Sequence, residues 1–164
     1  MAAPPAIVVI GVGSEYRSDD SIGLVAVREV ARLALPGVRV IEGISDGIDL
    51  INTWESADAA IVVDGTRSGA APGTILRFDA ITDQIPEEVF SSCSTHAFSI
   101  TEAVVLARML DRLPRMLIVY GVEAGSILKG VGLTSDVAAV LPEVVARIKE
   151  EINRLTRSLA QAAE

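Results

Sequence analysis

The sequence contains a single cysteine, Cys93, and a single histidine, His96. One cysteine excludes a disulfide within the chain, and one histidine excludes a zinc site built from several histidines. Basic residues are also scarce, because 14 Lys and Arg stand against 22 Asp and Glu, which gives a formal net charge of −8. This excess of acid disfavours binding to nucleic acid or to an anionic membrane, since both require a basic surface.

Long apolar runs are also missing. The longest segments without a charged residue, 2–14 and 89–101, are shorter than the roughly 18–20 apolar residues that span a bilayer. No basic segment precedes the apolar stretch near the N-terminus, so we expect no secretory signal. With the lone cysteine, these features predict a soluble, cytoplasmic protein that folds as one domain over residues 1–164, and we expect a monomer.

Apolar, β-branched runs alternate with segments of helical periodicity. The runs predict strands at 7–10, 38–41, 59–63, 74–78 and 116–121. The periodicity predicts helices at 22–33, after Asp46, at 97–110, and at 136–159 with an interruption or restart at Pro142. No helix precedes 74–78, so we expect that strand to be antiparallel, and 81–95 stays unassigned. The pattern predicts an α/β fold: a three-layer α/β/α sandwich with about five strands in a mostly parallel, twisted sheet and helices on both faces.

Polar residues follow the strands where a ligand would bind, beyond the carboxyl ends of a parallel sheet. Asp20 follows the first strand, Asp64 ends the third, and His96 opens a later helix. Two carboxylates and one imidazole form a mixed ligand set with open positions, which suits zinc or nickel and a catalytic site. Each residue also has an ordinary explanation: Ser18 caps a helix that Asp19 and Asp20 favour electrostatically, Asp64 lies in a turn, and His96 caps a helix.

Two other site chemistries are weaker. Residues 11–13 read Gly-Val-Gly after a strand, as in a dinucleotide-binding loop, but Tyr16 stands where the third glycine belongs. Glu42 at the end of the second strand suits a ribose, which keeps a nucleotide-binding α/β enzyme open as an interpretation. Cys93 and His96 are too close in sequence for a typical nucleophile–base pair, whose members usually come from different segments.

Several segments, in this order, resemble the hydrogenase maturation endopeptidases. The string from Ile7 to Gly23 is similar to that family's opening, an apolar strand with G-x-G-N, then R-x-D-[DE] and a glycine three positions later. Asp64 after two valines resembles its strand-end aspartate, and 94–96 (Ser-Thr-His) its S-x-H. Residues 120–123 (Tyr-Gly-Val-Glu) and 132–134 (Gly-Leu-Thr) resemble its two later segments.

The resemblance implies a metal-dependent endopeptidase that removes the C-terminal extension of a [NiFe] hydrogenase large-subunit precursor after nickel insertion. It implies Asp20, Asp64 and His96 as the metal-binding and catalytic residues. The metal it implies is nickel, shared with the substrate's own site, while zinc or another divalent ion is an alternative in vitro. Asp19 would be an assisting acid. A non-catalytic binding module for a nickel-containing partner is the alternative function.

Two departures from the family pattern leave the identity of the processed hydrogenase open. Ser14 stands where the family has Asn after G-x-G, and residues 42–44 read Glu-Gly-Ile where it has Asp-Gly-Gly. Neither departure removes a presumed metal ligand.

Overall fold

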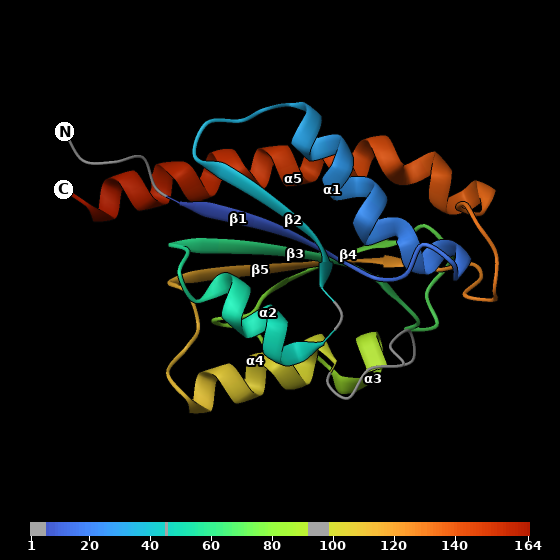
Figure 1. The fold of residues 1–164 in the computed structure, drawn as a ribbon, viewed down its shortest axis with the longest axis horizontal. Helices are drawn as coiled ribbons and strands as arrows, with labels where there is room; N and C mark the ends of the chain where they lie inside the picture. The colour runs from blue at the N-terminus through green and yellow to red at the C-terminus, as the bar shows by residue number, and fades with distance from the viewer. Residues whose placement is uncertain (1–5, 45, 92–98) are drawn as a thin grey trace.

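The computed structural model describes residues 6–44, 46–91 and 99–164 (Figure 1). The strands are β1 (Ile7–Val12), β2 (Val38–Ile44), β3 (Ala59–Thr66), β4 (Ile75–Asp79) and β5 (Met116–Glu123). A short 3-10 helix, η1 (Ser18–Ser21), precedes the α-helices. These are α1 (Ile22–Arg32), α2 (Gly47–Trp54), α3 (Glu87–Ser91), α4 (Ile100–Met109) and α5 (Ser135–Ala162).

The five strands form one sheet in the order β2-β1-β3-β5-β4. β1 pairs in parallel with β2 and β3, and β3 pairs in parallel with β5. β4 is antiparallel to β5, as its lack of a preceding helix predicts. The chain passes from β1 to β2 on one side and later returns to β3 on the other side of β1. The carboxyl ends of β1 and β3 therefore flank a topological switch point, where open α/β sheets bind their ligands.

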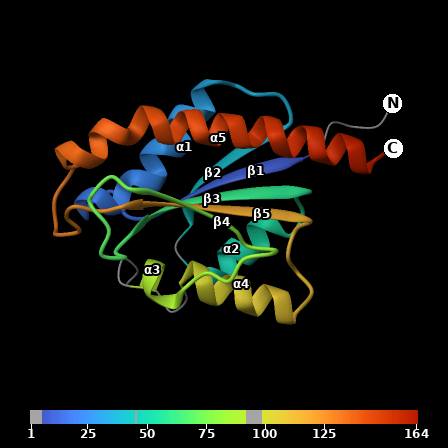
Figure 2. The ribbon, with the colours of Figure 1, turned by 180° about the vertical axis from the view of Figure 1, so that it is seen from behind.

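Helices cover both faces of the sheet (Figures 1 and 2), which confirms the three-layer arrangement. α1 and α5 pack on one face with Val9, Ile61 and Val63, and α2, α3 and α4 pack on the other with Val8 and Val62. Alternate residues of the central strands thus enter opposite cores, so these strands read as continuous apolar runs. In the described part of the chain, no helix combines the length and the apolar character needed to cross a membrane.

Several strands are longer at their carboxyl ends than the apolar runs indicate. β3 continues to Thr66, so Asp64 lies within the strand and pairs with Gly121 of β5. β1, β2 and β5 extend in the same way. At these ends the backbone stays paired although the apolar run gives way to polar residues or glycine. Hydrophobic patterning therefore does not predict that these residues belong to the strands.

Two helix predictions need correction. α5 runs through Pro142 without interruption. Proline has no N–H, so the carbonyl of Ala138 loses its donor within the helix. Ala138 and Pro142 are both exposed, so water can bond to that carbonyl while the buried face of the helix stays packed. Ser99 does not belong to the helix predicted at 97–110, because its backbone is extended and its side chain accepts a hydrogen bond from the Glu102 N–H. α4 therefore begins at Ile100, while residues 97 and 98 lie outside the described residues. In the unassigned region, the structure contains α3.

Gly23 sets how closely α1 approaches the sheet. A Cβ at Gly23 would lie 2.3 Å from the carbonyl oxygen of Val63 and 2.4 Å from that of Val12. The first turn of α1 therefore rests on the backbone of both β1 and β3, with no room for a side chain between them. This contact positions the chain just before α1, including Asp20, over the carboxyl end of β3.

A buried ionic group joins α5 to the other half of the sheet. Glu151 of α5 is 1% exposed and accepts hydrogen bonds from the Tyr120 hydroxyl (2.8 Å) and from Arg77 Nε (2.6 Å). Burial alone raises the pKa of Glu151, but the hydrogen bonds from Arg77 and Tyr120 and the charges of Arg77 and Arg154 outweigh it, so the net pKa is lowered. Burial and the neighbouring carboxylate raise the pKa of Tyr120 to about 12.

We expect Gly23→Ala to lower the free energy of unfolding by about 3 kcal/mol, because the new methyl group overlaps two backbone carbonyls that cannot move independently. Urea denaturation measures the change. Gly130→Ala is the matched control, since the nearest atom to a Cβ there is 4.0 Å away, and we expect no loss of stability. Equal stabilities for the two variants would contradict the packing argument.

We also expect an alkaline loss of stability that depends on Tyr120. The pKa of Tyr120 is about 12 in the folded chain and about 10 in the unfolded chain. The stabilisation that the neutral Tyr120 gives the folded chain is therefore fully present below pH 10. As the pH rises toward 12, the free energy of unfolding falls by up to about 2 kcal/mol. The test compares urea midpoints at pH 9 and 11.5, with Tyr120→Phe losing this dependence and Tyr16→Phe, at an exposed tyrosine, keeping it. An identical alkaline response of wild type and Tyr120→Phe would refute the assignment.

Candidate active site

The structure brings two of the three predicted site residues together at the switch point. Asp20 lies in η1, directly after the loop that follows β1, and Asp64 lies near the carboxyl end of β3. η1 rests on β3, because a Cβ built at Gly65 would be 3.7 Å from the Cα of Asp20. Residues 44 positions apart in sequence therefore meet at the carboxyl ends of the central strands, as the predicted topology requires.

Both carboxyl groups are buried and act on each other. Asp20 is 5% exposed and Asp64 is 4% exposed. Burial raises the pKa of Asp64 well above its usual range, and the negative charge of Asp20 raises it further. Two backbone donors hold the pair: Ser14 N–H donates to Asp20 Oδ2 (3.1 Å) and Gly65 N–H donates to Asp64 Oδ1 (2.7 Å). Two mutually repelling, buried carboxylates form a site with an affinity for a cation.

The third predicted ligand, His96, and the neighbouring Cys93 lie outside the described residues. Within residues 6–44, 46–91 and 99–164, no group of three or more His, Cys, Asp and Glu side chains is placed to hold a metal ion. Of the three predicted ligands, Asp20 and Asp64 are therefore the two that the described residues include.

Asp19 has a structural role that differs from the one predicted for it. Its side chain is fully buried and accepts four hydrogen bonds from the loop between β5 and α5. The donors to Oδ2 are Gly125 N–H, Ser126 N–H and the Thr134 hydroxyl, and the donor to Oδ1 is Thr134 N–H, at 2.7–2.9 Å. Four donors hold this carboxylate in one orientation. Asp19 therefore fixes this loop and is not an available general base.

Ser18 does not cap α1, because Ser18 is the first residue of η1 and α1 begins only at Ile22. The residue before η1, Arg17, makes no side-chain capping bond, and neither does Ser21 before α1. Ser18 has a left-handed backbone (φ 50°), and its hydroxyl donates to the carbonyl of Gly132 at 3.2 Å. Its side chain thus joins the same two loops that Asp19 connects.

Glu123, at the end of β5, is a second buried acid that holds a loop. It accepts hydrogen bonds from the Thr66 hydroxyl (2.6 Å), from the Ser68 N–H and hydroxyl (2.8 Å each), and from Gly69 N–H (3.1 Å). The chain after β3 is thereby fixed to β5. In the sequence, Glu123 drew attention only as part of the segment 120–123. Its position as an acid at the end of a buried strand, with hydroxyl residues in the neighbouring loop, is the feature that indicates its role in holding that loop.

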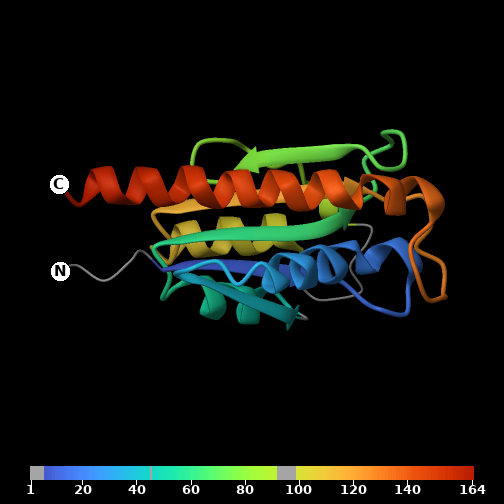
Figure 3. The ribbon, with the colours of Figure 1, turned by 90° about the horizontal axis from the view of Figure 1, so that it is seen from above.

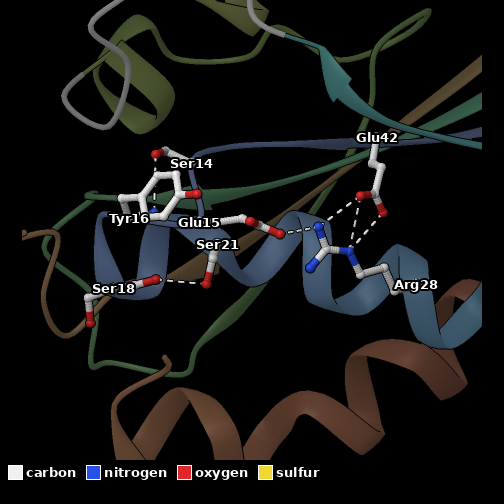
Figure 4. Close-up of polar contacts among 7 residues, drawn as sticks. All are labelled: Ser14, Glu15, Tyr16, Ser18, Ser21, Arg28 and Glu42. Atoms are coloured by element: carbon white, nitrogen blue, oxygen red, sulfur yellow. Dashed lines mark hydrogen bonds and ion pairs between the residues drawn. The ribbon is translucent and has the colours of Figure 1, made fainter. Parts of the chain in front are cut away.

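Glu42 is engaged by an arginine, which argues against the dinucleotide interpretation. Arg28 of α1 binds both oxygens of Glu42 (2.8 Å each) and also contacts Glu15 (Figure 4). The hydrogen bonds from Arg28 lower the pKa of Glu42. In the glycine loop, the Ser14 N–H points at the Asp20 carboxylate, so the position a phosphate would occupy holds a negative charge of the protein itself.

We expect Asp19→Asn to lower the free energy of unfolding by about 3 kcal/mol, because one amide oxygen cannot replace two carboxylate oxygens that accept four buried donors. Hydrogen exchange at Gly125, Ser126 and Thr134 should accelerate at least tenfold. Asp136→Asn is the control, an exposed acid two residues after Thr134, with an expected effect below about 0.5 kcal/mol. Unchanged exchange at the three amides in Asp19→Asn would show that Asp19 does not hold the loop.

The fold has known counterparts. The hydrogenase maturating endopeptidase HybD from E. coli superimposes with a TM-score of 0.73 at 21% identity, over 91% of this chain and 93% of that one. The [NiFe] hydrogenase maturation protease HybD from Thermococcus kodakarensis gives 0.63 at 24% identity, over 90% and 98%. At these identities the comparison establishes a shared α/β fold.

Sequence comparisons extend the likeness to the family. The hydrogenase expression/formation protein HupD of Thiocapsa roseopersicina is 29% identical over 98% of this chain and 71% of its own length. HoxM of Azotobacter vinelandii, which carries the same description, is 32% identical over 73% of this chain, and the match spans 58% of HoxM. A family model described as hydrogenase maturation protease matches residues 25–151. The chain therefore belongs to the hydrogenase maturation protease family, and its activity is that of a hydrolase, a hydrogenase maturation endopeptidase.

Proposed function

We propose that this endopeptidase removes the C-terminal extension of a [NiFe] hydrogenase large-subunit precursor after nickel insertion, at a divalent metal site formed by Asp20, Asp64 and His96. The observation that carries the proposal is the pair of buried carboxylates, Asp20 and Asp64, at the switch point. Membership of the maturation protease family supports the substrate class.

The donor set fits a borderline divalent ion. Two carboxylates and one imidazole leave coordination positions open for substrate or water, which separates a catalytic site from a structural one. Burial and, next, the negative charge of Asp20 raise the pKa of Asp64, and a cation bound by both carboxylates would oppose both effects. Nickel is the proposed ion. It is part of the substrate, and the enzyme's donors would share it with the precursor's own site. Zinc or another divalent ion would occupy the same donors in vitro.

The bound ion would supply Lewis acidity toward the scissile carbonyl and the attacking water. The residues of the chain orient the site for this chemistry. Ser14 N–H and Gly65 N–H fix one oxygen each of Asp20 and Asp64, which orients the two carboxylates before substrate arrives. Hydrolysis adds one water across the peptide bond, so the mature subunit gains a new C-terminal carboxylate and the extension leaves with a new amino terminus.

A cytoplasmic place of action belongs to the same proposal. The sequence offers one cysteine for disulfide chemistry, which agrees with a reducing compartment. The acidic chain, with its formal charge of −8, has no general electrostatic attraction to nucleic acid or anionic lipid.

The decisive experiment incubates the enzyme with a nickel-loaded precursor and with the nickel-free precursor, and follows the precursor's mass. We expect the nickel-loaded precursor alone to lose the mass of the extension. A stable complex with no change in mass would instead identify a non-catalytic binding module. An intact precursor that an established maturation protease does cleave would refute the proposal.

We expect Asp20→Asn, Asp64→Asn and His96→Ala each to reduce processing at least about 100-fold. The fold should persist, because Asn is isosteric with Asp and carries no buried charge; for Asp64→Asn the unfolding free energy should stay equal or rise. Titration with Ni²⁺ or Zn²⁺ alone, read by calorimetry, should show weaker binding in all three variants. Asp111→Asn is the matched control, since Asp111 is exposed and its left-handed backbone (φ 55°) tolerates Asn. Wild-type processing by Asp64→Asn would remove it from the site.

A further inference from the structure

Three large apolar side chains project into solvent beside the candidate active site. Tyr16 is 67% exposed, Leu128 is 77% exposed and Val131 is 86% exposed. Tyr16 belongs to the loop after β1 (Figure 4), and the other two belong to the loop between β5 and α5. We refer to these three residues as the apolar platform. Single exposed apolar residues are ordinary, but three gathered on adjacent loops at a functional edge indicate an interaction surface.

The two loops form one continuous surface. Ser18 N–H donates to the Gly130 carbonyl (3.0 Å), Gly130 N–H donates to the Tyr16 carbonyl (2.9 Å), and Asp19 N–H donates to the Ser126 carbonyl (3.0 Å). Arg17 and Gly130 form an isolated parallel β-bridge. Figures 1 and 3 both show the loops side by side at the same end of the sheet. Residues more than 100 positions apart in sequence are therefore presented together.

The platform is also rigidly supported. Beneath it, the buried carboxylate of Asp19 accepts four hydrogen bonds from the β5–α5 loop, and the Ser18 hydroxyl adds a bond to Gly132. A loop that is fixed in advance loses little conformational entropy when a partner binds, so its exposed apolar side chains contribute more of their burial to affinity. Rigid support under exposed apolar residues is what a preformed docking surface requires.

The form and charge of the platform indicate its occupant. Its side chains project from the surface, so they fit a hollow on a folded protein better than a small molecule or an extended peptide, both of which need a groove. Arg17 and Lys129 stand in the same two loops, although the chain carries a net charge of −8. A complementary partner therefore has an apolar hollow with acidic groups at its rim. Tyr16 precedes Asp20 by only four residues, so such a partner would contact the platform and the active site at once.

We propose that the apolar platform docks the folded body of the precursor, at an apolar, acid-rimmed hollow next to the segment that is cleaved. This inference rests on the proposed function, since it names the surface by which that substrate is held. Docking energy gained away from the scissile bond is retained in the transition state, so the platform should lower KM and leave kcat nearly unchanged.

The test measures KM and kcat for nickel-loaded precursor with Leu128→Ser/Val131→Ser. We expect KM to rise at least about tenfold with kcat within twofold, because both side chains are exposed and their loss leaves the loop's backbone hydrogen bonds intact. Lys129→Glu should raise KM at low ionic strength, and added salt should reduce that effect. The matched control is Val105→Ser/Met109→Ser, which changes two exposed apolar residues (49% and 78%) on α4, away from the platform, and should leave both constants unchanged.

The outcomes separate this inference from the proposed function. Wild-type processing with an unchanged KM in Leu128→Ser/Val131→Ser overturns the platform while the proposed function stands. An equal rise of KM in the α4 control overturns the platform as well, since it would show a nonspecific loss of surface hydrophobicity. If wild type cleaves no precursor, the proposed function fails. In that case the binding of nickel-loaded precursor to wild type and to the platform variant, measured by calorimetry, still decides the docking claim: unequal affinities support it, and equal affinities refute it.

Discussion

The close contact of α1 with the backbones of β1 and β3 determines the geometry of the candidate active site at the carboxyl ends of these strands. Gly23 lies against the carbonyls of Val12 and Val63 at distances that exclude a Cβ, so the first turn of the helix spans two neighbouring strands. Gly13 makes a related contact, because its left-handed backbone (φ 136°) places it directly against the carbonyl of Asp20. The chain between these glycines has little freedom, and this is why Asp20 lies on β3 near Asp64.

Four buried acids share this edge, and their surroundings divide them into two kinds. Asp19 and Glu123 each accept several hydrogen bonds from backbone and hydroxyl donors, so donors of the protein itself offset the cost of burying each carboxyl group. Asp64 instead has a pKa well above its usual range, first because it is buried and then because of the negative charge of Asp20. The first pair fixes the surrounding loops, and the second pair places two buried carboxylates close together at the switch point. The structural acids thereby position the reactive ones.

The sequence predicts the order of strands and helices, the antiparallel β4 and the convergence of Asp20 with Asp64, because each rests on local periodicity or on a general rule of α/β topology. It does not predict the role of Asp19, since adjacent aspartates look alike until the partner loop, more than 100 residues away, is in place. The cap assigned to Ser18 is wrong for a similar reason: η1 has no periodicity to indicate it. The predicted interruption at Pro142 is wrong because the destabilisation that a proline causes in a helix depends on whether the carbonyl it leaves unpaired is exposed to water. That exposure is a property of the tertiary structure.

The two sides of the switch point are held with very different strength. On the β5 side, the support is buried: Asp19 is fully enclosed with its donors, and breaking such contacts costs several kcal/mol. On the β2 side, the backbone of Glu42 is paired with β1, but its side chain is held by an ion pair with Arg28, which also contacts Glu15. All three side chains are about 40% exposed, and exposed pairs of this kind contribute about 0–1 kcal/mol. Displacing these three side chains therefore costs little, whereas breaking the buried contacts on the β5 side costs much more. Residues 42–44 (Glu-Gly-Ile), which depart from the family pattern, lie on the side whose side-chain support is weaker, whereas the loops that fix the carboxylate pair are supported by buried hydrogen bonds.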